Sequence, residues 1–126
     1  MPNEFTLLSG DDSLTLPFMA VGACGVVSVV SNLITAEIAQ MVKAFASGRT
    51  EASMKLHEKY YPLFKNMFVE TNPVPVKYAM TLMGLIMEEY RLPLVPASDA
   101  NKAIISETLR KCGLKPVTTE PIPFKN

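Results

Sequence analysis

The sequence of 126 residues contains no tryptophan, one histidine and two cysteines. The scarcity of histidine and cysteine argues against the metal sites and disulfide frameworks that these residues build. A single histidine, His57, excludes a multi-histidine metal centre, and Cys24 and Cys112 lie too far apart for metal-ligand spacing. We therefore expect no metal site and no cofactor. So few cysteines also argue against a disulfide framework, and they favour a reducing compartment, the cytoplasm, as the location.

The sequence also lacks an excess of charge of either sign. Twelve lysines and arginines balance twelve aspartates and glutamates. A nucleic-acid-binding protein usually carries a basic excess or patch, so we expect no nucleic-acid partner. The longest apolar stretches are about ten residues and contain glycine, too short to span a bilayer. The acidic, polar start MPNEFTLLSG does not have the form of a secretory signal. No membrane partner is expected.

Hydrophobic residues make up 48% of the chain and charged residues 19%, which is typical of a folded domain. The N-terminal part has the pattern of a strand, a helix and a second strand: an apolar run at 5–8, a helix from Leu14 that closes at Gly22, and an apolar run at 24–30. The second run is apolar on both faces, which is typical of a parallel strand covered on both sides, with Cys24 buried at its start. We expect a right-handed βαβ unit.

The remainder of the chain has helical periodicity, with apolar residues at i, i+3, i+4 and i+7. The expected helices span residues 35–47, 51–69, 73–86 and 98–113. Two prolines in residues 90–96 predict an extended segment there. Two parallel strands alone leave both edges of their sheet open, so the strands need more sheet than this sequence contains.

Four segments stand in an order and at separations that match a known family. They are Leu7-Leu8-Ser9-Gly10-Asp11-Asp12, Gly25-Val26-Val27-Ser28-Val29, Asn72-Pro73-Val74-Pro75-Val76-Lys77 and Arg91-Leu92-Pro93-Leu94. On these segments the sequence resembles the C-terminal part of the dihydrodipicolinate synthases (4-hydroxy-tetrahydrodipicolinate synthases). These belong to the pyruvate-dependent class I aldolases, a family that also includes N-acetylneuraminate lyase. The last two segments favour the synthases over the sialic acid lyases.

The resemblance implies an α/β fold, namely the C-terminal portion of a (β/α)8 TIM barrel followed by a helical extension. This chain would supply the last two strands and be mostly α. Residues 5–9 then correspond to strand seven and residues 24–30 to strand eight. We expect three parts: residues 1–48 as the end of the barrel, residues 49–114 as the helical extension, and residues 115–126 as a proline-rich tail.

The resemblance also implies an activity that this chain lacks by itself. The family is a group of lyases whose synthases condense pyruvate with aspartate semialdehyde, in lysine biosynthesis, through a lysine Schiff base. The Schiff-base lysine precedes the matched part, and none of the nine lysines here falls in either predicted strand. We therefore expect no catalytic residue in this chain and no activity without an N-terminal barrel portion.

The partners implied are pyruvate and aspartate semialdehyde in the complete enzyme. A homo-oligomer or pairing with an N-terminal barrel portion is expected at the protein level. The alternative, from a different functional class, is a non-catalytic helical interaction or oligomerisation module. Such a module would pair with a separate N-terminal half or with itself.

Five residues are the candidate substrate-binding residues that the resemblance implies. Gly10 would let substrate approach the backbone while Asp11 and Asp12 shape the entrance; the alternative is a turn glycine with an N-cap aspartate. Val27 matches a position whose backbone carbonyl faces bound pyruvate, and its side chain is expected in the barrel core. Ser28 matches a substrate-contacting serine of the sialic acid lyases, or is a strand hydroxyl with a local partner.

Overall fold

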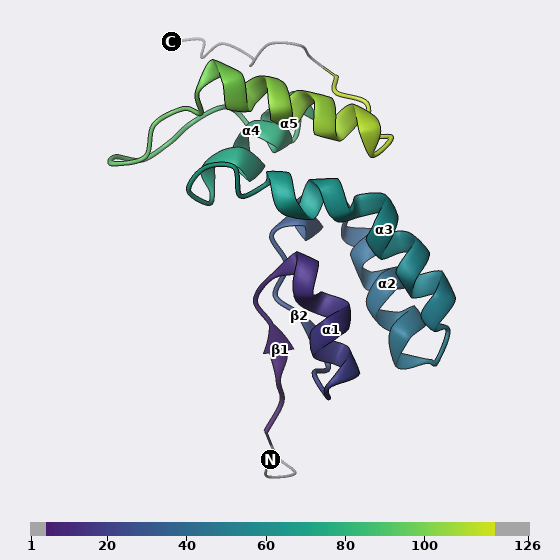
Figure 1. Cartoon of the computed structure of the whole chain (residues 1–126). Helices are drawn as coiled ribbons and strands as arrows, with labels where there is room; N and C mark the ends of the chain where they lie inside the picture. The colour runs from purple at the N-terminus through teal and green to yellow at the C-terminus, as the bar shows by residue number, and fades with distance from the viewer. Residues whose placement is uncertain (1–4, 118–126) are drawn as a thin grey trace. The chain divides into compact units, whose positions relative to one another are not determined.

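A computed structural model of the chain describes residues 5–117. These residues form two units whose boundary lies between Tyr61 and Pro62, inside the helix α3 (Thr50–Asn66) (Figure 1). The strands all belong to the first unit in the described part of the chain, and helices predominate in both units. No helix within residues 5–117 is long and apolar enough to cross a bilayer.

The first unit begins with the predicted strand, helix and strand. In chain order the elements are β1 (Leu8–Ser9), the 3-10 helix η1 (Asp12–Leu14), α1 (Thr15–Ala20) and β2 (Gly25–Val26). The two strands pair in parallel, with Leu8 opposite Gly25. Helix α1 packs against both strands, as Figure 1 shows. The predicted parallel βαβ unit is therefore confirmed.

The second strand is much shorter than predicted, because only Gly25 and Val26 of residues 24–30 are paired. At Val29 the backbone is already helical (φ −77°, ψ −47°), and the 3-10 helix η2 (Val30–Asn32) follows. Cys24 is exposed, contrary to the prediction. The physical reason is that strand pairing on the second edge of β2 is absent among the described residues, so extended backbone beyond Val27, whose N–H still bonds to the Ser9 carbonyl, gains no ladder hydrogen bonds.

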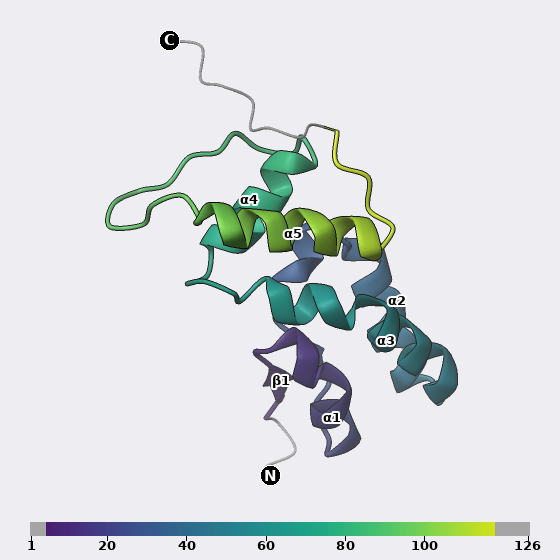
Figure 2. The ribbon, with the colours of Figure 1, turned by 45° about the horizontal axis from the view of Figure 1, so that its top comes forward.

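Helix α2 (Thr35–Ala46) and the first half of α3 complete the first unit. The predicted helix at 35–47 is confirmed, and its buried residues Ile38 and Met41 share one face. The Ser53 hydroxyl of α3 is fully buried and donates a hydrogen bond to the Met41 carbonyl (2.8 Å). Figures 1 and 2 both show α2 alongside the first half of α3.

The second unit is built on α4 (Val74–Leu82) packed against α5 (Asp99–Lys111), as Figure 2 shows. The predicted helix at 98–113 is confirmed, with Ser98 as its N-cap. The helix predicted at 73–86 ends early, at Leu82. Gly84 adopts a positive φ of 71° and its N–H bonds to the Thr81 carbonyl (2.9 Å), which closes the helix as a C-terminal glycine does.

A carboxylate ties the start of α5 to the turn that precedes α4. Glu70 accepts hydrogen bonds from the Asn101 side-chain amide (2.6 Å) and from the Ser98 backbone N–H (2.9 Å). These hydrogen bonds favour the charged form, so they hold the pKa of Glu70 below its ordinary value. Residues 87–98 between α4 and α5 are non-helical, in agreement with the prediction for 90–96.

Candidate functional site

All five predicted site residues lie just beyond the carboxyl ends of the two parallel strands. Gly10, Asp11 and Asp12 follow β1, and Val27 and Ser28 follow β2. In parallel α/β folds this end of the sheet is where loops from neighbouring strands converge and where active sites are built. The predicted residues therefore come from two different loops at one end of one sheet.

Asp12 joins these two loops. One carboxylate oxygen, Oδ2, accepts hydrogen bonds from the backbone N–H groups of Val29 (3.0 Å) and Val30 (3.2 Å). The Asp12 carbonyl in turn accepts from the Thr15 hydroxyl (2.9 Å). The residue is only 1% exposed. Because a buried carboxylate is costly unless it is hydrogen-bonded, these two amide donors account for its presence here.

The second carboxylate oxygen of Asp12, Oδ1, is buried and has no hydrogen-bond partner within residues 5–117. A carboxylate has lone pairs for about four hydrogen bonds, so this oxygen keeps its accepting capacity. Asp12 was expected either to shape the substrate entrance with Asp11 or to be an N-cap. The N-cap of η1 is Asp11, and Asp12 cross-links the two loops.

Asp11 is the residue that caps a helix. Its Oδ1 accepts hydrogen bonds from the Ser13 backbone N–H (2.7 Å) and the Ser13 hydroxyl (2.6 Å), at the start of η1. Gly10 is exposed, and a Cβ placed on it would meet no atom within 4 Å. Packing within the described residues therefore does not require glycine at this position.

The loop after β2 differs from its prediction in one respect. The Val27 side chain, predicted in the barrel core, is 67% exposed, because the described residues provide no neighbouring strand to cover it. Ser28 is engaged locally: its hydroxyl oxygen accepts from the Ser31 N–H (2.9 Å), and its carbonyl accepts from the Ser31 hydroxyl (3.0 Å). The Ser28 hydroxyl thus has a local hydrogen-bond partner, as the second of the two alternatives predicted for Ser28 states.

An open depression of about 420 Å³ borders this site along β2 and α2. Its lining is mostly apolar and includes Leu8, Val26, Ile38 and Val42. The depression lies on the first unit alone and is bordered by both strands, by β1 through Leu8 and by β2 through Gly25 and Val26. An apolar depression beside a strand edge is a surface that further strand could cover.

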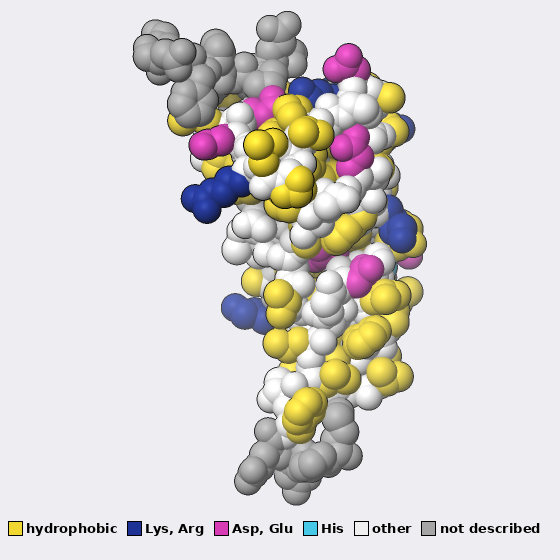
Figure 3. Space-filling view, turned by 90° about the vertical axis from the view of Figure 1, so that its left-hand side faces the viewer, with side chains coloured by type: hydrophobic (Ala, Val, Ile, Leu, Met, Phe, Trp, Pro, Cys, Tyr) yellow, Lys and Arg dark blue, Asp and Glu magenta, His cyan; other side chains and the backbone are white. Residues whose placement is uncertain are grey.

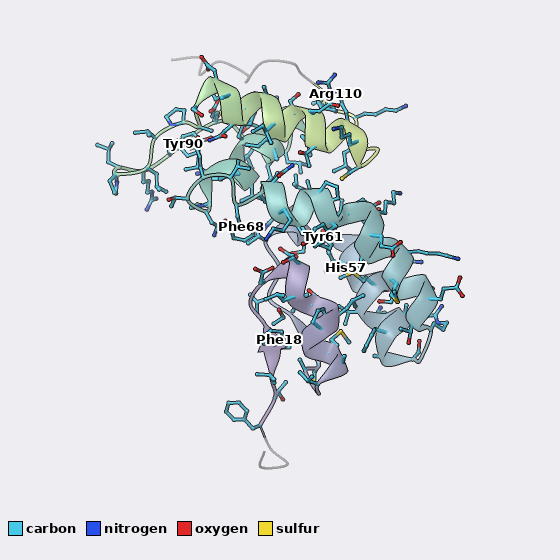
Figure 4. The ribbon with its side chains drawn as sticks, in the orientation of Figure 1. Phe18, His57, Tyr61, Phe68, Tyr90 and Arg110 are labelled. Carbon is cyan, nitrogen blue, oxygen red and sulfur yellow. The ribbon has the colours of Figure 1, made fainter. Side chains whose placement is uncertain are left out.

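His57, the only histidine, lies away from the strand ends on α3. Its ring stands 5.6 Å from that of Tyr61, tilted by 48°, and both side chains are labelled in Figure 4. Burial lowers the pKa of His57, because it disfavours the charged imidazolium. Among the residues that the structure describes, no group of three or more histidine, cysteine, aspartate or glutamate side chains could hold a metal ion.

Sequence reasoning missed a polar cluster in the second unit. Glu88 accepts a hydrogen bond from the Tyr90 hydroxyl (3.2 Å) and forms a half-buried ion pair with Lys102 (3.3 Å). The Lys77 ammonium lies 5.3 Å from the centre of the Tyr90 ring, and the Lys102 ammonium lies 5.1 Å from that of Tyr78. Figure 4 labels Tyr90 in the loop before α5. The pattern Asn-Pro-Val-Pro-Val-Lys marked Lys77, but nothing in the sequence linked it to Tyr90.

The parallel βαβ unit, its converging loops and the helices that follow match the C-terminal part of a class of protein, the TIM barrels, since solved TIM-barrel synthases superpose on this chain. The profile of the Dihydrodipicolinate synthetase family matches residues 1–112. The chain therefore belongs to that family.

Known relatives agree with this assignment. The 4-hydroxy-tetrahydrodipicolinate synthase of Chlorobium limicola is 48% identical over 113 residues, which are 90% of this chain and 38% of the relative. The crystal structure of dihydrodipicolinate synthase from Aquifex aeolicus matches with a TM-score of 0.90 at 41% identity, over 94% of this chain and 40% of that one.

A third comparison is with an enzyme that holds a ligand. The chloride-inhibited dihydrodipicolinate synthase of Acinetobacter baumannii, complexed with pyruvate, matches with a TM-score of 0.84 at 30% identity, over 87% of this chain and 38% of that one. The chain thus spans about 38% of the length of the curated relatives it matches.

Proposed function

We propose that this chain forms the end of the barrel and the helical extension of a lyase of the 4-hydroxy-tetrahydrodipicolinate synthase type. The complete enzyme would condense pyruvate with aspartate semialdehyde through a lysine Schiff base. One observation carries the proposal: the residues that match the family's substrate loops lie together beyond the carboxyl ends of β1 and β2, and Asp12 links the two loops.

In this proposal the chain supplies one wall of the pyruvate pocket. Gly10 supports that role because it is exposed and nothing lies near its Cβ position, so a ligand could approach the backbone. Val27 would turn its carbonyl toward pyruvate, and Asp11 and Ser28 would complete the wall. Polar groups that already have local partners, as those of Asp11 and Ser28 do, are held in a fixed orientation before substrate arrives.

The chain alone would be inactive. A Schiff-base lysine must lose part of its hydration, or sit beside another cation, to be nucleophilic near neutral pH. No lysine within residues 5–117 lies in β1 or β2. The lysines of the first unit, Lys43, Lys55 and Lys59, are exposed helix residues. Activity would therefore require an N-terminal barrel portion as a partner.

A cytoplasmic location goes with this proposal. Cys24 is exposed and Cys112 is buried, and no disulfide joins them. Cysteines outside disulfides are typical of a reducing compartment, where the small-molecule substrates of such a lyase would also be available.

The test is to mix the chain with the N-terminal part of the Chlorobium limicola relative that the match does not cover. Borohydride reduction in the presence of pyruvate, followed by intact-mass measurement, should place the adduct on the N-terminal part, and the mixture should form product. This chain alone should give neither adduct nor product. A pyruvyl adduct on this chain alone would contradict the proposal. A soluble, associated but inactive mixture would leave the interaction module as the function.

A further inference from the structure

The two backbone amides that Asp12 holds come directly after the loop proposed to face pyruvate. Val27 and Ser28 leave β2, and the N–H groups of Val29 and Val30 then bond to the Asp12 carboxylate at 3.0 and 3.2 Å. Ser28 closes the same turn through its paired bonds with Ser31. The direction of the Val27 carbonyl is therefore fixed on one side by the β1 pairing and on the other by Asp12.

The pairing of β2 alone is too short to fix that carbonyl. The ladder includes only Gly25 and Val26, extended by the bond from the Val27 N–H to the Ser9 carbonyl (2.8 Å). Beyond Val27 no backbone ladder continues among the described residues. The carboxylate of Asp12 takes over at this point, and its own backbone is held by the Thr15 hydroxyl.

Asp12 itself is poorly placed to bind a substrate. Its side chain is almost fully buried, and the oxygen that bonds Val29 and Val30 is already used by two donors. A group that contacts pyruvate must be accessible, whereas both oxygens of this carboxylate are buried, including Oδ1, which has no partner among the described residues. Its burial and its two amide partners are those of a residue that acts through others.

We propose that Asp12 is a positioning residue, which sets the Val27 carbonyl and Ser28 for pyruvate without touching the substrate. This inference rests on the proposed function, because the hydrogen bonds from Val29 and Val30 to Asp12 can affect activity only if pyruvate binds beside Val27 and Ser28. An error of about 1 Å in the position of a substrate-binding group can lower a rate about 100-fold. The link is therefore expected to affect the KM for pyruvate more than the KM for the aldehyde.

Two variants and one matched control test the assignment. Asp12→Ala removes the acceptor, whereas Asp12→Asn keeps a carbonyl oxygen that can accept from the same two amides. Ser53→Ala is the control, since it removes another buried hydrogen bond of the same unit, to the Met41 carbonyl, far along the chain from the strand ends. All three are assayed in the mixture with the N-terminal part of the Chlorobium limicola relative, and by hydrogen exchange of the isolated chain.

Asp12→Ala should raise the KM for pyruvate at least about tenfold, leave the KM for aspartate semialdehyde nearly unchanged, and speed exchange of the Val29 and Val30 amides about tenfold. Asp12→Asn should keep the KM for pyruvate and the exchange rates of the Val29 and Val30 amides close to those of the wild type. Ser53→Ala should change neither KM value and neither exchange rate. Unchanged exchange, or equal KM shifts for both substrates, would overturn the positioning role in an active mixture. An inactive wild-type mixture would instead overturn the proposed function, and the positioning role with it.

Discussion

The two units differ in which elements leave apolar side chains in solvent. In the second unit the helices cover one another, and Leu63, Met67, Leu82, Ile105 and Leu109 are almost fully buried. In the first unit the strands and the residues beside them leave apolar side chains in solvent: Leu8 is 46% exposed and Phe5 and Val27 are more so. Hydrophobic atoms lie above the grey N-terminal residues in Figure 3.

The difference follows from what each kind of element needs. A helix satisfies its backbone hydrogen bonds internally and has only to bury one face, which a second helix can cover. A strand needs a neighbour on each edge and cover on each face. The second unit also exposes large apolar side chains, on α5 (Ile104) and in the segments around the helices (Leu85, Leu92), but none of them lies on a strand. The incomplete part of the chain is therefore its sheet.

The largest effect is expected from a charge in the first unit's core. Val30 is 0% exposed. Val30→Asp should cost roughly 3–5 kcal/mol, because it leaves a buried charge without a partner. Hydrogen exchange should then show the first unit unfolded while α4 and α5 stay protected. Val30→Ile is the apolar control and should keep both units folded. Equal loss of protection in both units would show that they do not differ in the way proposed.

The second unit has a matched test at a glycine. Gly84→Ala introduces a Cβ that would lie 2.6 Å from a Val117 methyl, at a positive φ of 71°. Positive φ alone costs roughly 1–2 kcal/mol for a residue with a side chain. Gly113 has a similar φ of 79° but open space around it, so Gly113→Ala measures that strain alone. In urea unfolding Gly84→Ala should lose more stability than Gly113→Ala; an equal loss would mean that Val117 moves aside freely.

A pH-dependent difference should also separate the units. Burial first, and then the Glu88 carboxylate, raise the pKa of Tyr90 above its ordinary value of 10.0. Tyr90 in the unfolded chain ionises near that value. The contribution of neutral Tyr90 to the stability of the folded state is therefore fully present below pH 10 and is lost as pH rises above it. Tyr78 is shifted in the same direction, by burial first and then by Glu88 and Asp99.

Tyr90→Phe should therefore flatten the loss of second-unit stability above pH 10. At pH 7 it should cost about 1.5 kcal/mol, the value of a hydrogen bond to a charged acceptor. Urea unfolding at pH 7, 10 and 11 measures both quantities. A residual slope from Tyr78 is expected; a slope identical to that of the wild type would refute the role of Tyr90.

The smallest effect on stability is expected at β1, which pairs with β2 on one edge only. The effect of the same change on assembly is expected to be larger. Leu8→Lys changes a half-exposed side chain beside the apolar depression, and should alter the free energy of unfolding by about 0.5 kcal/mol. It should nevertheless weaken association with the N-terminal barrel part, measured by sedimentation. Val21→Lys, at a position 78% exposed beyond α1, is the control. Equal association of both variants would mean that β1 is not part of the missing contact.

The helices could be predicted from the sequence because they bury their own faces. The spacing of Ile38 and Met41 indicated residues 35–47, and Ser98 marked the start of α5. The apolar run at 24–30 indicated a full strand, yet apolar character cannot reveal whether a neighbouring strand is present to pair with it. The paired part is therefore only Gly25 and Val26.

For the candidate site, the sequence predicted which loops hold the residues but not the hydrogen bonds between those loops. Its residues could be located because Gly10, Asp11 and Asp12 form a motif that follows a strand. The hydrogen bonds from the Val29 and Val30 amides to Asp12 could not be predicted, because every residue except proline has a backbone N–H and the sequence does not show which of them bonds to a side chain. The two amides also lie 17 and 18 residues from Asp12 in the sequence. The Tyr90 cluster was missed for a similar reason, because its members come from α4, a loop and α5.

The end of the second unit bears on where this chain can be shortened. The family match stops at residue 112. Five residues later the Val117 N–H bonds to the Leu82 carbonyl (2.9 Å), at the end of α4. A truncation chosen at the family boundary would leave that carbonyl without its backbone donor and remove the side chain beside Gly84. An expression boundary or a fusion tag is therefore better placed after Val117 than at the limit of the family match.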